Sequence, residues 1–239
     1  MTRTAIVTGS ASGIGAATVA ELARRGYRTV GIDMAAATEP LNSPEHLAIC
    51  ADVTDEARVI AAFDEALAFL GTLDVLVTSA GVGETTPFMD LTVDTFRSVN
   101  EVNVIGTFVC IREAALRMQP GARICTVSSV AGIRGGGLSG TAAYAASKGA
   151  VLALTKNAAR ALAPRGISVN TIAPGATLTP MIAEHWKNDA HRTRVEGMSV
   201  LNRTALPHEM AAAIAFLVSP EASSITGSTL VADNGLVMY

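Results

Sequence analysis

Tyr144 and Lys148 are the residues of this sequence whose types and spacing most directly suggest chemistry. Residues four apart share one face of a helix, with roughly 5–6 Å between their Cβ atoms. A tyrosine hydroxyl ionises near a pH of about 10, so it exchanges protons at neutral pH only where a positive charge stabilises the phenolate. Lys148 supplies such a charge if residues 142–163 form the helix that their composition indicates. The alternative is a solvated helix that carries both residues by chance.

A glycine-rich turn lies between an apolar strand and a helix near the start of the sequence. The strand is predicted at residues 4–8, the glycines occupy 9–15, the helix follows over 16–25, and a second strand over 28–32 ends at Asp33. Glycines let the backbone approach a pyrophosphate, a helix N-terminus favours its charge, and an acid at the next strand end accepts from ribose hydroxyls. Such a turn alone is more often only a turn, but this order favours a dinucleotide site.

Strands and helices continue to alternate without a linker or a change of composition. Further strands are predicted at 47–51, 73–78, 122–128, 166–172 and 228–231, and helices at 54–70, 94–118, 142–163 and 207–218. This alternation predicts a parallel sheet with helices on both faces, joined by right-handed crossovers. The expected fold class is therefore α/β, a doubly wound parallel sheet with about seven strands. Residues 1–239 are expected to form a single domain, with an irregular lid over the substrate at 176–206.

Composition narrows the class of protein. Of 239 residues, 49% are apolar and 16% charged, with a net charge of −3, which fits a well-buried globule and gives no basic surface for nucleic acid or an anionic membrane. Cys50, Cys110 and Cys125 are predicted to be buried small hydrophobes in a reducing compartment, because neither they nor the histidines show metal-ligand spacing. We expect no metal. The first strand begins too early for a signal peptide to precede it, so we expect a cytoplasmic protein.

Taken in order, these motifs resemble the short-chain dehydrogenase/reductase family over essentially the whole chain. The resemblance is carried by Thr8, Gly9, Gly13, Ile14, Gly15, Asp33, Asp52, Val53, Ala80, Gly81, Asn103, Ser129, Tyr144, Lys148, Pro174, Gly175, Thr179 and residues 225–227. It implies a Rossmann fold, a nicotinamide coenzyme and hydride transfer to or from a small alcohol or ketone.

The resemblance assigns a catalytic role to four residues. Tyr144 would be the general acid in ketone reduction and the base in alcohol oxidation, while Lys148 would lower its pKa and hold the nicotinamide ribose hydroxyls. Ser129 would orient the reacting oxygen, and Asn103 would help to place a water that links Lys148 to solvent. Ser129 lies fifteen residues before Tyr144, about two more than in many family members, so Ser128 is the alternative for the catalytic serine.

The resemblance also outlines the coenzyme site. Its expected residues are Gly9, Ser12, Gly13, Ile14, Gly15, Asp33, Asp52, Val53, Ala80, Gly81, Tyr144, Lys148, Pro174, Gly175, Thr177 and Thr179. Asp33 would accept from the adenosine ribose diol and repel a 2′-phosphate, while Ser12 and Met34 offer no cation, so NAD is favoured over NADP. Two positions depart from the family pattern. Ser79 replaces an asparagine, and Asn234 replaces a glycine in a turn, where asparagine tolerates a positive φ.

The substrate is defined less well. Pocket walls are expected from residues 82–89, 130–140 and 176–206, the last with Met181, Trp186 and Met198. Glu84 and Arg134 are the charged residues of the first two walls, which favours an uncharged or partly apolar secondary alcohol or ketone as substrate. The Met and Trp side chains are equally compatible with ordinary core packing.

Two other functions stay open. A 3-oxoacyl-thioester reductase of the fatty-acid type would usually prefer NADPH and need a basic docking surface, which Asp33 and the net charge oppose. A dinucleotide-binding regulator without catalysis is opposed by the complete set of Ser129, Tyr144 and Lys148. Members of the family are commonly homotetramers or dimers, and small residues along 142–163 suit close helix packing. We therefore expect a homo-oligomer whose further partner is a small-molecule substrate.

Overall fold

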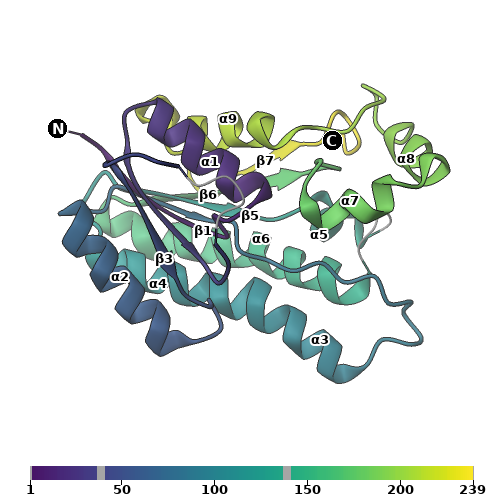
Figure 1. The fold of residues 1–239 in the computed structure, drawn as a ribbon, viewed down its shortest axis with the longest axis horizontal. Coiled ribbons are helices and arrows are strands. Elements are labelled where there is room, and N and C mark those ends of the chain that lie inside the picture. Colours follow the sequence, from purple (N-terminus) through teal and green to yellow (C-terminus); the bar gives the residue numbers. More distant parts are fainter. Residues whose placement is uncertain (1, 37–40, 137–140, 239) are drawn as a thin grey trace.

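The computed structural model describes residues 2–36, 41–136 and 141–238 of the chain. Within them, seven parallel strands form one sheet in the order β3-β2-β1-β4-β5-β6-β7. Figure 1 shows helices on both faces of this sheet. The predicted fold class, a doubly wound parallel α/β sheet, is confirmed.

The strands are β1 (Thr4–Thr8), β2 (Arg28–Asp33), β3 (His46–Cys50), β4 (Val75–Thr78), β5 (Arg123–Val127), β6 (Ser168–Pro174) and β7 (Thr229–Ala232). The helices of the described residues are α1 (Gly13–Arg24), α2 (Glu56–Leu70), α3 (Val93–Asn100), α4 (Thr107–Arg117), α5 (Val130–Arg134), α6 (Ala142–Leu162), α7 (Pro180–Trp186), α8 (Asp189–Glu196) and α9 (Pro207–Leu217). A π-helical segment, η1 (Glu101–Gly106), joins α3 to α4.

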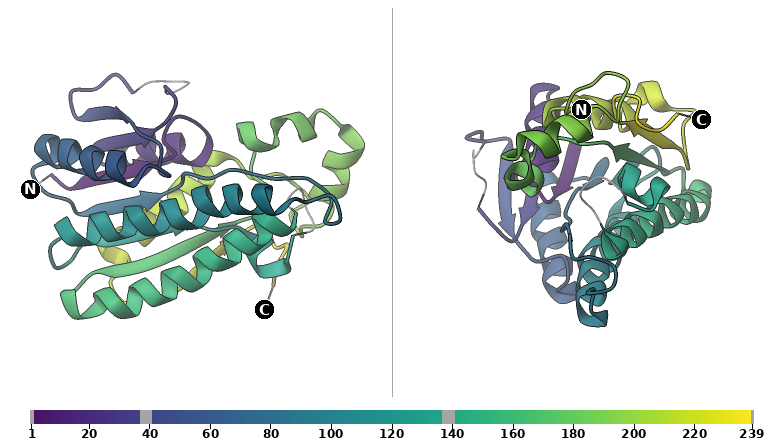
Figure 2. Two further views of the ribbon diagram at one scale, coloured as in Figure 1. Left: turned by 90° about the horizontal axis from the view of Figure 1, so that it is seen from below. Right: turned by 90° about the vertical axis from the view of Figure 1, so that its right-hand side faces the viewer.

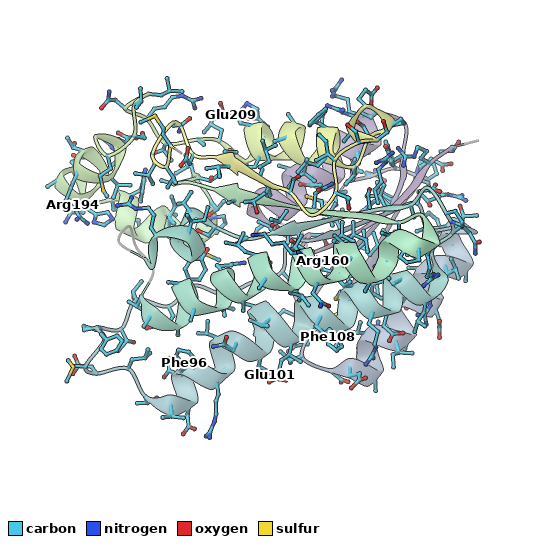
Figure 3. The ribbon with its side chains drawn as sticks, turned by 180° about the vertical axis from the view of Figure 1, so that it is seen from behind. Phe96, Glu101, Phe108, Arg160, Arg194 and Glu209 are labelled. Atoms are coloured by element: carbon cyan, nitrogen blue, oxygen red, sulfur yellow. The ribbon has the colours of Figure 1, made fainter. Side chains whose placement is uncertain are left out.

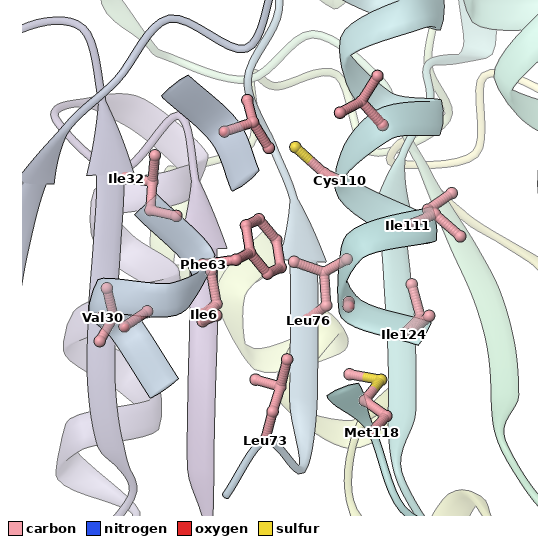
Figure 4. Close-up of a cluster of buried hydrophobic side chains, with 14 of the residues drawn as sticks. Ile6, Val30, Ile32, Phe63, Leu73, Leu76, Cys110, Ile111, Met118 and Ile124 are labelled. Atoms are coloured by element: carbon pink, nitrogen blue, oxygen red, sulfur yellow. The ribbon is translucent and has the colours of Figure 1, made fainter. Parts of the chain in front are cut away.

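The central strands are short apolar runs because both of their faces are covered. Successive side chains of a strand point to opposite faces of a sheet. Ile6 of β1 accordingly joins the core beneath α2 and α4, where Phe63 is also fully buried (Figure 4). Its neighbours Ala5 and Val7 join the second core, beneath α1 and α9. The strands are therefore fixed in register from both sides, and their carboxyl ends form one edge.

The segment predicted to be an irregular lid at 176–206 contains two helices, so that part of the prediction is wrong. Its ends are joined where the Leu178 N–H donates to Ala205 O at 2.9 Å and the Ala205 N–H donates to Ala176 O at 2.9 Å. Figures 1 and 2 show α7 and α8 projecting beyond the sheet on the side where α5 lies. Helix α8 buries Val195 alone, so its sequence carries no apolar periodicity from which a helix could be predicted.

Other differences have local causes. The single helix predicted over 94–118 is two helices separated by η1, and a short helix, α5, occupies part of the loop predicted after Ser129. Cys50 is exposed, so the prediction that all three cysteines are buried is wrong for this one. It lies on the edge strand β3, where Ile49 faces the core and Cys50 faces outward. The predicted burial of Cys110 and Cys125 is confirmed.

Candidate active site

A cavity with a volume of about 940 Å³ opens at the carboxyl ends of the strands. That volume is at the upper end of small-molecule sites, which span roughly 300–1,000 Å³. The predicted site residues that line it are Gly9, Ser12, Gly13, Ile14, Asp33, Asp52, Val53, Ala80, Gly81, Ser129, Tyr144, Lys148, Pro174, Gly175, Thr177 and Thr179. Two predicted residues, Gly15 and Asn103, do not line it. The topology thus brings motifs from six strand ends to one cavity.

The glycine-rich turn is shaped by close backbone contacts. Gly9 has a φ of +68°, and a Cβ there would lie 2.5 Å from Ala80 N. A Cβ on Gly15 would lie 1.9 Å from Gly9 O, so Gly15 packs the turn against α1 instead of lining the cavity. Ser12 precedes α1 in an extended conformation without a side-chain cap. The first N–H groups of α1 are the kind of donors that bind phosphate at a helix N-terminus.

Asp33 is the last residue of β2, and its carboxylate accepts hydrogen bonds from the backbone of two segments, the glycine-rich turn and the loop after β2. Its Oδ2 accepts from the Ala11 N–H at 3.0 Å, and its Oδ1 accepts from the Ala35 N–H at 2.9 Å. Since each carboxylate oxygen has a second acceptor position, the group can still receive two hydroxyl donors. Met34 beside it is 70% exposed and carries no charge. Lys148 is the one basic side chain among the described residues that line the cavity.

Tyr144 and Lys148 lie on the first two turns of α6, as their spacing predicts. Lys148 is 5% exposed, its Nζ donates to Val127 O at 3.0 Å, and it lies 5.8 Å from the centroid of the Tyr144 ring. Ser129 immediately precedes α5, accepts from the Ala131 N–H at 3.1 Å, and lies near enough to Tyr144 to lower the pKa of its hydroxyl. The three side chains therefore meet around the phenol.

The pKa of Tyr144 is raised by burial, and the nearby Ser129 side chain opposes that rise. Burial also lowers the pKa of Lys148, to about 8. The predicted lowering of the Tyr144 pKa by Lys148 is therefore wrong for this structure. The reason is geometric, because the ammonium group lies over the ring and donates to the Val127 carbonyl. Tyr144 is accordingly a protonated phenol at neutral pH.

Ser128 and Ser129 have different partners, which separates the two alternatives for the serine. Ser128 is 2% exposed, and its hydroxyl donates to Lys148 O at 2.7 Å. That bond holds the end of β5 against α6. Ser129, one residue later, is the serine that reaches the Tyr144 hydroxyl.

Asn103 is fully buried in η1, and its side chain forms hydrogen bonds both with the loop at Val82 and with Ser147 of α6. Its Oδ1 accepts from the Val82 N–H at 2.8 Å, while its Nδ2 donates to Val82 O at 3.0 Å and to Ser147 Oγ at 2.9 Å. The Ser147 hydroxyl in turn donates to Tyr144 O at 2.7 Å. Ser147 is not among the predicted site residues, although its place beside Lys148 could have indicated it. π-Helical segments occur frequently at functional sites.

The other end of the cavity is lined mainly by apolar side chains. Val82, Met181, Ile182 and Trp186 lie there, whereas Met198 does not line it. Residues 137–140 of the second predicted wall lie outside the described residues. Trp186 is 9% exposed, and its Nε1–H donates to Thr204 Oγ1 at 2.8 Å. The tryptophan thus both walls the cavity and packs α7 in place.

Lys148→Met is expected to stabilise the ligand-free protein near pH 7. Burial lowers the Lys148 pKa from 10.5 to about 8, so keeping the buried amine charged at pH 7 costs roughly 3 kcal/mol of folding free energy. Between pH 8 and pH 10.5, Lys148 is mostly protonated in the unfolded chain and mostly neutral in the folded chain. The folded state therefore gains stability as the pH rises through this range, and the cost is gone above pH 10.5. Loss of the hydrogen bond to Val127 offsets part of the gain.

Thermal unfolding of the wild type and of Lys148→Met at pH 7 and pH 10.5 tests this expectation. The variant should melt higher at pH 7, and its advantage should shrink at pH 10.5. The measured quantity is the melting temperature of the variant minus that of the wild type. If this difference is larger at pH 10.5 than at pH 7, Lys148 is not a buried cation in the folded protein.

No group of three or more His, Cys, Asp or Glu side chains among the described residues is arranged to hold a metal ion. Likewise, in this part of the chain we find no helix with the length and apolar character needed to cross a membrane.

Comparison with known proteins gives full-length matches. A family model described as enoyl-(acyl carrier protein) reductase matches residues 9–237. The cis-4-hydroxycyclohexanecarboxylate dehydrogenase of Sinomonas cyclohexanicum is 40% identical over 98% of this chain and 96% of that protein. The 3-oxoacyl-(acyl-carrier-protein) reductase FabG of Staphylococcus aureus is 35% identical over 100% of this chain and 99% of that protein. A Brucella melitensis structure described as a short-chain dehydrogenase/reductase, glucose/ribitol dehydrogenase, superposes with a TM-score of 0.90 at 31% identity, covering 99% of this chain and 97% of that one.

Proposed function

Because the chain belongs to the short-chain dehydrogenase/reductase family, we propose that it is an NAD-dependent oxidoreductase that interconverts a secondary alcohol and a ketone by hydride transfer. The observation that carries the proposal is the meeting of Tyr144, Ser129 and Lys148 in the same cavity whose rim holds Asp33. The test is an assay of nicotinamide reduction with a panel of secondary alcohols. A chain that binds coenzyme but turns over neither these alcohols nor a 3-oxoacyl thioester would instead be the catalytically silent regulator.

NAD supplies the hydride acceptor when it is bound. Asp33 would hold the adenosine ribose, the N-terminus of α1 would receive the pyrophosphate, and Lys148 would hold the nicotinamide ribose hydroxyls. Ser129 donates to the reacting oxygen and fixes its position beside Tyr144. During reduction the Tyr144 hydroxyl would give its proton to the carbonyl oxygen. During oxidation Tyr144 would first lose its proton to solvent, and its phenolate oxygen would then take the hydroxyl proton of the alcohol.

The charges along the cavity support NAD over NADP. A 2′-phosphate would meet the Asp33 carboxylate, and neither Ser12 nor Met34 offers a cation to bind it. Lys148, the one basic side chain of the described lining, is committed to the other end of the coenzyme in this mechanism.

The remaining predicted residues have supporting roles. Asn103 positions Val82 and Ser147 and would help to place a water beside Lys148. Gly15 keeps the turn compact. Residues 1–239 act as one domain, and 176–206 form the lid over the substrate. The free cysteines support a reducing compartment, the cytoplasm, as the place where the protein works.

A 3-oxoacyl-thioester reductase is the second candidate, favoured by the full-length similarity to the Staphylococcus aureus enzyme. The two functions differ in coenzyme and in substrate. Faster turnover of a 3-oxoacyl thioester with NADPH than of any secondary alcohol with NAD would support this alternative.

The outer face of α3, η1 and α4 supports the proposal of a homo-oligomer, either a dimer or a tetramer. Exposed apolar side chains lie along it, and Figure 3 shows Phe96 and Phe108 on its outer surface. The others are Val93, Ile105 and Leu116. Contiguous apolar surface of this kind marks protein interfaces. Light scattering should give a mass that is a multiple of 24.5 kDa, and Phe108→Glu should lower it. A wild-type mass of a single chain would contradict the proposal.

A further inference from the structure

Glu84 is a buried acid in an otherwise exposed loop, and it lines the cavity. It is 9% exposed, while Gly83 and Thr85 on either side are exposed. One carboxylate oxygen accepts from the Thr86 N–H, and the other accepts from the Thr141 hydroxyl. The Glu84 carbonyl also accepts from the Thr141 N–H at 3.2 Å. No cation of the described residues forms an ion pair with it.

The contacts of Glu84 and its neighbours place it at the substrate end. Thr141, whose hydroxyl donates to Glu84, precedes α6, and Tyr144 lies three residues further on, about one helical turn along the axis from Thr141. A Cβ on Gly83 would lie 3.3 Å from Met181, and one on Gly81 would lie 3.3 Å from Lys148 Nζ. Residues 81–84 therefore run from Lys148 to the lid, away from Asp33.

The hydrogen bonds of Glu84 leave acceptor capacity unused. A carboxylate has about four acceptor positions, and two are taken by Thr86 and Thr141. A substrate hydroxyl can fill another, whereas a substrate carboxylate would bring a second negative charge. Lys148 is the one cation of the described lining, and it donates to Val127 O. Among the described residues, no basic side chain other than Lys148 lines the cavity to offset the charge of Glu84.

We propose that Glu84 determines substrate specificity, selecting secondary alcohols that carry a further hydroxyl and rejecting those that carry a carboxylate. The inference rests on the proposed function and names the substrate class of that same site. The Sinomonas relative is named for a hydroxycyclohexanecarboxylate, so this chain would differ from it in the charge of its substrate.

Charge repulsion sets the expected size of the effect. Two like charges about 5 Å apart at an effective dielectric of about 20 disfavour the complex on the order of 100-fold. A site built to bond a hydroxyl also loses affinity for an analogue that lacks it. Cyclohexane-1,4-diol, cyclohexanol and 4-hydroxycyclohexanecarboxylate share one ring and differ at the group opposite the reacting carbon.

The experiment measures kcat/KM of the full chain with NAD for these three alcohols. The wild type should use the diol best and the carboxylate worst, with a diol-to-carboxylate ratio of about 100 or more. Glu84→Gln keeps a side-chain acceptor for the Thr86 N–H and removes the charge, so the ratio should fall at least tenfold. An unchanged ratio in Glu84→Gln, or a wild type that prefers the carboxylate, overturns the inference.

Two control variants separate charge from loop packing. Glu101→Gln removes another acid that lines the cavity, and it should leave the ratio within about twofold of the wild type. Thr141→Val removes the hydroxyl that anchors Glu84 and keeps its charge. If Thr141→Val lowers the ratio as much as Glu84→Gln does, loop position and not charge is responsible, and the inference fails. No turnover of any of the three alcohols would overturn the proposed function itself.

Discussion

Tyr144→Phe is expected to lower kcat for alcohol oxidation by about 100- to 10,000-fold while the affinity for NAD is kept. The substitution removes one oxygen atom, the one that takes the alcohol proton, and leaves the ring against Lys148 and the helix intact. Ser129 loses its phenol partner but stays held by the Ala131 N–H. Steady-state rates followed at the nicotinamide absorbance, together with quenching of protein fluorescence by coenzyme, measure the two quantities separately.

Tyr27→Phe is the matched control. Tyr27 is 8% exposed, belongs to the core beneath α1 and accepts from Arg3 Nη1 at 2.9 Å, and it does not line the cavity. Its loss should cost stability and leave kcat within about twofold, because a buried hydrogen bond contributes only ~1 kcal/mol. Undiminished turnover by Tyr144→Phe would refute its role in proton transfer. Joint loss of turnover and coenzyme affinity would make its role structural.

Asp33→Ala combined with Met34→Arg is expected to shift the ratio of kcat/KM for NAD over that for NADP by about 100-fold or more toward NADP. The change removes the carboxylate that would repel a 2′-phosphate and adds a guanidinium beside it. A hydrogen bond to a charged group is worth about 1.5–3 kcal/mol, which is roughly 10- to 100-fold for each of the two effects. Initial rates with both coenzymes at one alcohol concentration give the ratio.

Single substitutions at Met34 and at Asp33 separate the contribution of the added cation from that of the removed carboxylate. Met34→Arg leaves the hydrogen bond from the Ala11 N–H to Asp33 intact, so NAD affinity should change little while NADP affinity rises. Asp33→Asn keeps the side-chain shape and removes the charge. Equal use of NAD and NADP by the wild type would refute the charge argument for coenzyme choice.

The edge on which the motifs meet could be predicted because strands and helices alternate along the chain and the central strands β1 and β4 are short, mainly apolar runs. Such strands form parallel sheets covered on both faces, and a parallel sheet carries every carboxyl end on the same edge. Gly9, Asp33, Ser129 and Pro174 follow four of these strands, and the structure brings all four to the cavity. The core that each side chain joins follows from alternation along the strand, which sends Ile6 to one core and Val7 to the other.

Contacts between distant segments could not be predicted in this way. Glu84 forms a hydrogen bond with Thr141, which is 57 residues away in the sequence, and Asn103 forms one with Ser147, which is 44 residues away. Neither pair produces a local pattern in the sequence. The π-helical segment has no compositional signal either. The N-terminus of the polar helix α8 is capped by the Asn188 side chain, which accepts from the His191 N–H.

Transfer of deuteride from the reacting carbon of a secondary alcohol to the nicotinamide ring tests hydride transfer most directly. The full-length wild type is mixed with NAD and cyclohexane-1,4-diol deuterated at its carbinol carbons, and the coenzyme is examined by mass spectrometry and proton NMR. We expect NADH that carries one deuterium on its ring, formed at least 100-fold more slowly by Tyr144→Phe. Unlabelled NADH, or equal formation of labelled NADH by both proteins, would contradict the proposed reaction.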